Sequence, residues 1–157
     1  MDIRLATVND CKQLVEMRID MRNEREKPLD KKHEDLFLYY STKFFNEEIL
    51  TGRFIAYVAE EQDKIIAMSG LSLYSVPPTY DNLNGKVAYL MNMYTRPQYR
   101  KKGLGTILLQ KAVEYAKENN YSKVILNASE MGRPLYTKYG FTDLENEMVY
   151  IINNVIF

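Results

Sequence analysis

Residues 87–106 read VAYLMNMYTRPQYRKKGLGT, and the character of the chain changes twice within them. Val87 to Tyr94 is nearly all apolar, which predicts a central strand buried on both faces. Pro97 ends that strand, and four of the seven residues from Arg96 to Lys102 are basic. Two glycines then open a run with helical periodicity. A strand, a basic loop and a helix N-terminus together predict a site for a phosphate group, because the first turn of a helix presents unpaired N–H groups.

The two commonest phosphate-binding loops do not fit this stretch. A P-loop needs Gly-Lys followed by Ser or Thr, whereas the order here is Lys102-Gly103. A dinucleotide fingerprint needs a third Gly or Ala, and Leu108 occupies that position. It also needs an acidic residue about twenty positions on, where Lys123-Val124-Ile125-Leu126 offers none. The pattern left is Arg-x-x-Gly-x-Gly, over Arg100 to Gly105.

Upstream, the sequence predicts a short strand at Ile3–Ala6 and two helices. Thr7 is suited to cap the first helix, which ends near Asn23. A charged connection, Glu24–Asp35, precedes a second helix that Asp30 caps and Gly52 ends. Two apolar runs, Phe54–Ala59 and Ile65–Leu71, flank a polar turn and predict a hairpin.

Downstream, Ser75–Gly85 reads as a loop, and a helix runs from Gly103 to Asn119-Asn120. A strand at Lys123–Asn127, a helix at Arg133–Tyr139 capped by Gly140, and a last strand at Met148–Ile152 complete the pattern. The order β-α-α-β-β-β-α-β-α-β predicts an α/β fold with one mixed sheet and helices on both faces.

Composition sets the outer bounds. The chain has 157 residues, with 21 Lys and Arg against 21 Asp and Glu, so we expect one domain over 1–157 and no nucleic-acid partner. A single cysteine, Cys11, gives no disulfide framework and reads as a small buried residue. The only histidine, His33, has no ligand at metal spacing. Without a signal-like start or an apolar run of about 20 residues, the expected location is cytoplasmic, with no membrane partner.

At Arg100 to Gly105 the chain resembles the GNAT superfamily of N-acetyltransferases, in which this pattern binds the pyrophosphate of acetyl-coenzyme A (acetyl-CoA). The resemblance continues in Ser129 to Phe141, SEMGRPLYTKYGF, whose Leu135-Tyr136 and Gly140-Phe141 match the closing segment of the family. It covers nearly the whole chain. It implies a mostly antiparallel sheet and an enzyme that transfers the acetyl group of acetyl-CoA to a primary amine, without a metal.

The resemblance also implies roles for particular residues. The pantetheine arm would lie along the main chain of Met93, Tyr94 and Thr95, with a backbone N–H near Met93 stabilising the oxyanion. Tyr136 matches the tyrosine that protonates the departing thiolate, and Ser129 stands where many relatives have an Asn that contacts the coenzyme. The pyrophosphate would be bound by the segment made up of Arg100, Lys101, Lys102, Gly103, Leu104, Gly105 and Thr106.

Some questions stay open at this stage. Some relatives place a Glu in the fourth strand, but Tyr89 stands there in this chain, so the general base is unassigned. A non-catalytic module that senses CoA or docks a protein on the same fold is the alternative. The acceptor, a small-molecule or peptide amine, would be walled by Glu24–Asp35 and Ser75–Gly85. A homodimer is also left open.

Overall fold

The computed structural model describes residues 1–151, and the chain divides into two compact units, Met1–Asn127 and Ala128–Phe157. The second unit contains α4 (Arg133–Tyr139). The first contains, in chain order, β1 (Asp2–Leu5), α1 (Cys11–Asn23), α2 (Lys31–Leu50), β2 (Phe54–Glu61), β3 (Lys64–Ser75), β4 (Lys86–Thr95), α3 (Leu104–Glu118) and β5 (Lys123–Leu126).

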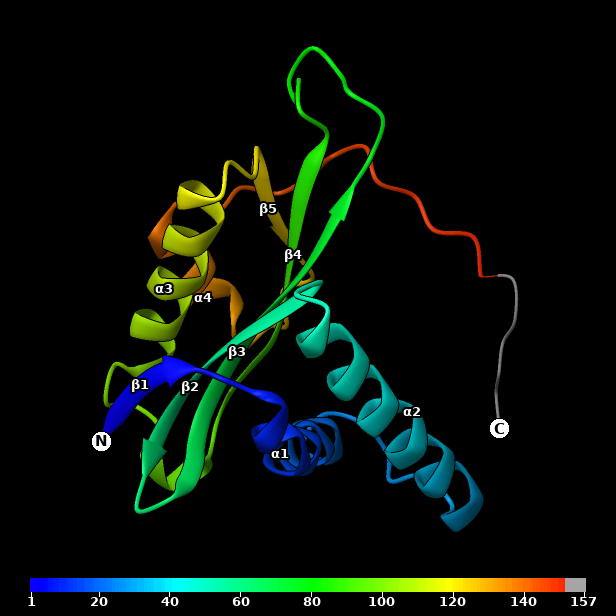
Figure 1. Cartoon of the computed structure of the whole chain (residues 1–157), viewed down its shortest axis with the longest axis vertical. Helices are drawn as coiled ribbons and strands as arrows, with labels where there is room; N and C mark the ends of the chain where they lie inside the picture. The colour runs from blue at the N-terminus through cyan, green and yellow to red at the C-terminus, as the bar shows by residue number, and fades with distance from the viewer. Residues whose placement is uncertain (152–157) are drawn as a thin grey trace. The chain divides into compact units, whose positions relative to one another are not determined.

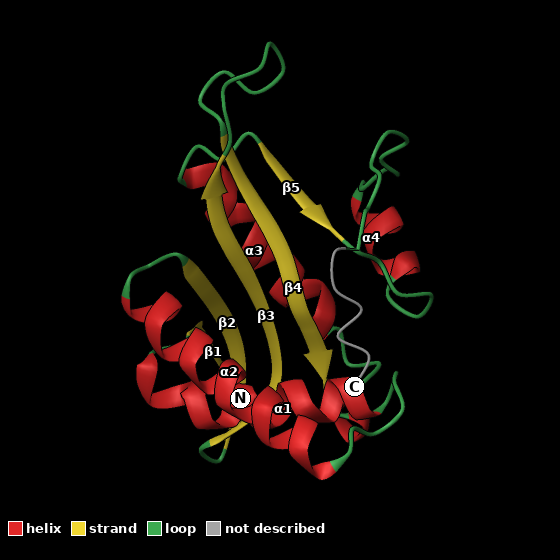
Figure 2. Cartoon of the chain, turned by 90° about the vertical axis from the view of Figure 1, so that its right-hand side faces the viewer, coloured by secondary structure: helices red, strands yellow, loops and turns green. Residues whose placement is uncertain are grey.

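The five strands form one sheet in the order β1-β2-β3-β4-β5 (Figures 1 and 2). Neighbouring strands from β1 to β4 are antiparallel, whereas β4 and β5 are parallel. A parallel pair needs a crossover, and α3 provides it between β4 and β5. The predicted mixed, mostly antiparallel sheet is confirmed.

Helices cover both faces of the sheet, as expected from the sequence. Figure 2 shows α1 and α2 in front of the strands and α3 behind them. On the first face, side chains of both helices pack with strand residues such as Phe54, Val58 and Met68. On the second, Leu104 and Leu108 of α3 pack against the strands. Each face of the central strands is therefore buried, which explains their nearly continuous apolar runs.

The hairpin predicted between β2 and β3 closes through a two-residue turn. Glu61 pairs with Lys64, and the intervening Gln62 and Asp63 have φ values of 50° and 62°. Positive φ at both positions matches the right-handed twist of the strands. The Gln13 side chain of α1 holds this turn, donating to the Asp63 carbonyl at 3.2 Å and accepting from the Ile65 amide at 2.8 Å.

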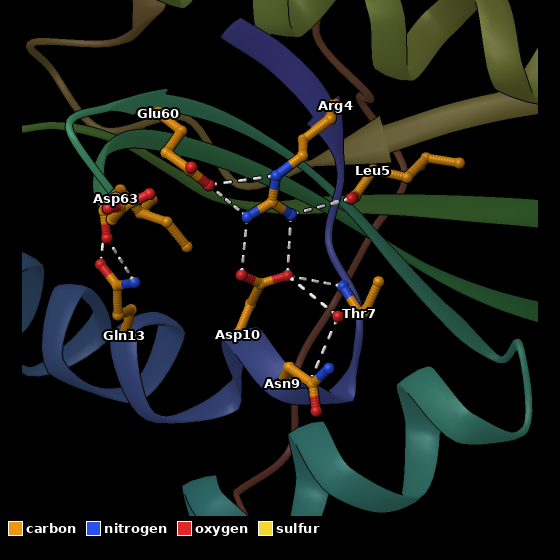
Figure 3. Close-up of polar contacts among 9 residues, drawn as sticks. Arg4, Leu5, Thr7, Asn9, Asp10, Gln13, Glu60 and Asp63 are labelled. Atoms are coloured by element: carbon orange, nitrogen blue, oxygen red, sulfur yellow. Dashed lines mark hydrogen bonds and ion pairs between the residues drawn. The ribbon is translucent and has the colours of Figure 1, made fainter.

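Arg4 joins the first strand to the helix that follows it. Figure 3 shows its guanidinium between the carboxylates of Glu60 and Asp10. Two N–H groups of Arg4 donate to the two Asp10 oxygens at 2.9 Å each, and Asp10 also accepts from the Thr7 amide at 2.7 Å. Thr7 thus caps a 3₁₀ turn, Val8–Asp10, that leads into α1. Thr7 is therefore a cap, as predicted, but of this turn; the N-cap position of α1 itself is Asp10.

We expect Asp10→Asn to lower the free energy of unfolding by about 1–2 kcal/mol at pH 7, because it breaks a bidentate, charge-assisted pair. Arg4 lowers the pKa of Asp10 below its ordinary value of 3.8, against the opposing effect of burial. A lowered folded pKa stabilises the protein above the unfolded pKa and loses that effect as the pH falls through the folded one. Urea unfolding of both proteins should show the gap shrinking below about pH 4. Asp2→Asn, at an exposed position, is the control and should change little.

Two expectations about the ends of elements need correction. The strand predicted at Met148–Ile152 is wrong for Met148 to Ile151, which form no strand in the described part of the chain, and Ile152 lies outside the described residues. Met148 is 99% exposed and Ile151 64%. An apolar pattern alone does not supply the neighbouring strand that a ladder requires. Asp30 caps α2 as predicted, accepting from the His33 amide at 3.2 Å, but residues 31–35, predicted to lie in the connection, already belong to that helix.

Candidate functional site

The second half of β4 has one free edge. On one side β4 pairs with β3 as far as Thr95, opposite Ala67. On the other side its parallel pairing with β5 runs only from Val87, opposite Lys123, to Leu90, opposite Leu126. Figure 2 shows the two strands diverging beyond this point. Within residues 1–151, no strand pairs with the β5-facing edge of Met91–Thr95, so this backbone is available to an extended ligand.

A bulge interrupts β4 at the same place. Met68 pairs with Tyr94 but Gly70 pairs with Met91, so that Asn92 and Met93 together face the single residue Ser69. Asn92 has a φ of 54° and is only 6% exposed. Its side-chain oxygen accepts a hydrogen bond from Arg18 of α1. Sequence reasoning missed this bulge, although an Asn inside an apolar strand was the available signal, since Asn adopts positive φ more readily than most residues.

At the end of β4, Arg96 anchors the chain and does not point to a ligand. Its amide donates to the Ile66 carbonyl at 2.9 Å, continuing the β3 pairing. Its guanidinium donates to the Ile65 carbonyl at 3.1 Å and to Asp20 of α1 at 2.8 Å. One of the four basic residues of the loop therefore has a structural role.

Arg100 is likewise engaged within the protein. Its guanidinium donates to the Thr95 carbonyl at 2.8 Å and to Glu24 at 2.6 Å, and it lies 5.5 Å from the centre of the Tyr94 ring. The Tyr94 hydroxyl donates to the other Glu24 oxygen at 2.6 Å. Burial, together with this bond to Glu24, raises the pKa of Tyr94 to about 12. Burial alone would raise the pKa of Glu24, but the bonds from Tyr94 and Arg100 lower it overall.

The turn before α3 leaves a group of backbone amides without an acceptor among residues 1–151. Lys101 and Gly103 have φ values of 61° and 81°, and Gly103 occupies the N-cap position without a side-chain cap. The first amide of this helix with an acceptor is that of Ile107, which donates to the Gly103 carbonyl at 3.1 Å. In the described part of the chain the amides of 104–106 have no hydrogen-bond acceptor.

The charge around these amides is positive. The first turn of α3 contains no acidic residue, and the helix dipole adds a partial positive charge at this end. Lys101 and Lys102 are exposed, and the Lys102 ammonium lies 5.2 Å from the centre of the Tyr99 ring. Backbone donors, a positive helix end and two exposed ammonium groups form a site suited to a phosphate or pyrophosphate.

In the second unit, Ser129 precedes α4 and Tyr136 lies within it. The Ser129 hydroxyl accepts from the Gly132 amide at 3.2 Å, ahead of α4. The Tyr136 ring lies edge-on to Phe141, with centroids 5.9 Å apart. Gly140 ends the helix with a φ of 114°, and the Phe141 amide donates to the Tyr136 carbonyl at 3.0 Å. The helix predicted at Arg133–Tyr139 and its Gly140 cap are confirmed.

Residues 1–151 contain no group of three or more His, Cys, Asp or Glu side chains placed to hold a metal ion. Across the same residues, none of the helices has both the length and the apolar character of a membrane span. Cys11 is buried, as predicted, and burial raises the pKa of its thiol.

Comparison with solved structures gives a match over almost the whole chain. A predicted acetyltransferase from Clostridium acetobutylicum, crystallised with acetyl-CoA, is 34% identical and superposes with a TM-score of 0.86 over 96% of this chain and 95% of its own. A GCN5-related N-acetyltransferase from Ralstonia eutropha gives a TM-score of 0.85 at 24% identity, over 97% of this chain and 99% of its own.

Curated proteins match over shorter stretches. The glucosamine 6-phosphate N-acetyltransferase of Trypanosoma brucei brucei is 30% identical over 79 residues, which are 50% of this chain and 54% of that protein. The thialysine N-epsilon-acetyltransferase of Bos taurus is 26% identical over 98 residues, 60% of this chain and 55% of that protein. The chain therefore spans about half the length of these curated relatives. The model of the acetyltransferase (GNAT) family matches residues 17–141, and the chain belongs to that family.

Proposed function

We propose that the chain is an N-acetyltransferase that transfers the acetyl group of acetyl-CoA to a primary amine. The observation that carries this proposal is that two features occur together: a free strand edge at Met91–Thr95 and amides without hydrogen-bond acceptors at the start of α3. An extended, amide-bearing arm that ends in a pyrophosphate is complementary to both features. The similarity to an acetyltransferase crystallised with acetyl-CoA supports the choice of ligand.

In this proposal the pantetheine arm lies along the main chain of Met93, Tyr94 and Thr95. The pyrophosphate accepts from the amides between Arg100 and Thr106, and the exposed ammonium groups of Lys101 and Lys102 add charge. The Arg100 side chain does not contact the pyrophosphate in this proposal. Its guanidinium is bound by Glu24 and the Thr95 carbonyl, and it thereby positions the turn. Ser129 accepts from Gly132, and its own O–H remains able to donate to the coenzyme.

The reaction is proposed as a direct attack of the neutral amine on the thioester carbonyl. The amine nitrogen forms the new C–N bond and gives up one proton to water, the C–S bond breaks, and the electron pair leaves on sulfur. The backbone N–H near Met93 stabilises the negative charge on the carbonyl oxygen, an effect worth roughly 2.7–4 kcal/mol elsewhere. Tyr136 donates its proton to the sulfur, a role assigned from the Leu135-Tyr136 and Gly140-Phe141 segment.

We also propose that the two units act as one acetyltransferase domain over 1–157. The family model supports this, because its match over residues 17–141 continues across the boundary between Asn127 and Ala128. The acceptor in this proposal is a small-molecule or peptide amine. The names of the Trypanosoma and Bos relatives, which act on amines of small molecules, favour the former.

The test is release of the free CoA thiol when the protein is incubated with acetyl-CoA and a panel of primary amines. Amine-dependent release supports the proposal. The second candidate is a non-catalytic CoA sensor, which is favoured by the lack of any carboxylate between Lys86 and Thr95. Tight acetyl-CoA binding with no release across the panel would establish the sensor and overturn the enzyme.

Thr106→Glu should affect the stability of α3 and its binding of the pyrophosphate in opposite directions. A carboxylate in the first turn of a helix stabilises the free protein, by about 0.3–1 kcal/mol. The same charge repels a pyrophosphate bound to the neighbouring amides, so the Kd for CoA should rise about 10- to 100-fold. Calorimetric titration and thermal unfolding measure the two effects, with Thr106→Gln as the uncharged control. Unchanged CoA affinity in Thr106→Glu would remove the pyrophosphate from this turn.

A further inference from the structure

Arg18 of α1 is a half-buried guanidinium that forms no ion pair with any carboxylate in the described part of the chain. Five arginines of the first unit are half-buried: Arg4, Arg18, Arg22, Arg96 and Arg100. Within residues 1–151, Arg18 is the only one of these that makes no ion pair with a carboxylate. The chain thus neutralises every other half-buried guanidinium of this unit and leaves this one.

The surroundings of Arg18 hold its side chain in place without neutralising its charge. One of its terminal N–H groups donates to the Asn92 side-chain oxygen, and the Phe37 ring of α2 lies 5.7 Å from the guanidinium carbon. A guanidinium has five N–H donors, and the others find no acceptor among the described residues. Burial lowers the pKa of Arg18, and so does the nearby charge of Arg22, which is itself paired with Glu26.

Arg18 lies beside the bulge of β4, next to the proposed reaction site. Its hydrogen-bond partner Asn92 is the bulge residue that immediately precedes Met93, whose backbone N–H we assign to the oxyanion. A bulge residue with positive φ, 6% exposed, lies in the central strand with its amide oxygen turned to the guanidinium. A half-buried charge without an ion-pair partner is unfavourable, so this guanidinium is a candidate contact for an anionic ligand.

We propose that Arg18 binds a carboxylate or phosphate group of the acceptor, so that the substrate is an amine that also carries an anion. This rests on the proposed function in that it takes the bound amine to be the acceptor. A planar guanidinium with several free N–H groups matches both anions, which accept two parallel hydrogen bonds from it. Asn92 orients the guanidinium, and the anion fixes the amine relative to the bulge.

The test compares amines in matched pairs that differ in one anionic group, including L-lysine with cadaverine and glucosamine 6-phosphate with glucosamine. Equilibrium binding to the CoA-saturated full chain is measured by calorimetry, and turnover by thiol release. We expect the member that carries the anionic group to bind about 10- to 100-fold more tightly than its partner without that group, in at least one pair. If no anionic member binds more tightly, the proposal is overturned.

Three variants assign the preference to Arg18. Arg18→Gln should abolish it, and Arg18→Lys should retain part of it, since a single ammonium replaces a fork of donors. Asn92→Asp supplies an internal carboxylate to Arg18 and keeps a residue that tolerates positive φ. It should therefore keep or raise the thermal stability while it abolishes the preference. Arg25→Gln, at an exposed arginine just beyond the same helix, is the control and should leave the preference intact.

The outcomes separate this proposal from the function on which it rests. A preference that survives both Arg18→Gln and Asn92→Asp gives Arg18 a structural role and overturns the anion site. If the preference depends on Arg18 but no amine releases thiol, the anion site stands and the acetyltransferase proposal falls.

Discussion

Tyr136→Phe is expected to lower kcat by about 10²–10⁴ and to leave the Kd for acetyl-CoA unchanged. The substitution removes only the hydroxyl that we assign to protonation of the departing sulfur. The ring and its edge-on contact with Phe141 remain, so the local packing of α4 should persist. Steady-state thiol release at saturating acetyl-CoA measures kcat, and calorimetry measures coenzyme binding.

Tyr139→Phe provides the matched control for this change. Tyr139 lies on the same helix and its ring also contacts Phe141, with centroids 6.2 Å apart. The chemical change is identical, but no role in the reaction is assigned to this hydroxyl, so kcat should stay near that of the unmodified protein. If Tyr136→Phe turned over as fast as Tyr139→Phe, Tyr136 would lose its proposed role as general acid.

Gly70→Val is expected to lower the free energy of unfolding by about 3 kcal/mol, the upper part of the range for overpacked cores. A Cβ at Gly70 would lie 2.2 Å from the outermost carbon of the Phe54 ring. That ring is 1% exposed and has the rings of Phe44 and Phe45 at 5.3 Å and 5.5 Å. It therefore has no room to move aside, and β2 and β3 must separate. Urea unfolding measures the loss.

Phe54→Leu in the Gly70→Val background should recover part of the stability, because the shorter side chain vacates the space that the new methyl groups need. Gly52→Ala is the comparison for a glycine without such a contact. Its Cβ would have no atom within 4 Å, although its φ is 69°, so only backbone strain of about 1 kcal/mol is expected. Equal losses in Gly70→Val and Gly52→Ala would show that crowding against Phe54 is not the cause.

Features determined by neighbours in the sequence were predictable. The turn between Phe54–Ala59 and Ile65–Leu71, the Thr7 cap and the Gly140 cap each depend on residues within a few positions of one another. The Gly103 start of α3 is of the same kind, since a glycine with a φ of 81° stands directly before a helical repeat. Local propensity and tertiary structure agree at these positions, so the pattern was sufficient.

Features that join distant segments were not predictable from one sequence. The sequence predicts Arg100 beside a pyrophosphate, but it does not reveal that Glu24 pairs with the Arg100 guanidinium across 76 positions of the chain. Arg96 pairs in the same way with Asp20. That Arg18 has no ion-pair partner among the described residues can be seen only once the ion pairs of the other half-buried arginines are known. The failed strand at Met148–Ile151 shares this cause, since apolar residues do not reveal the partner they need.

The turn before α3 is fastened at both ends by the folded core. Arg96 is bonded to β3 through the Ile66 carbonyl, and Leu104 is 2% exposed in the cluster with Ile66 and Ala67. The turn is therefore already ordered in the free protein, and binding of an anion does not have to pay the conformational entropy that ordering a flexible loop would cost. The association rate of CoA with this turn should then be limited by diffusion, without a slow rearrangement step. It should also fall with rising ionic strength, because Lys101 and Lys102 attract the pyrophosphate.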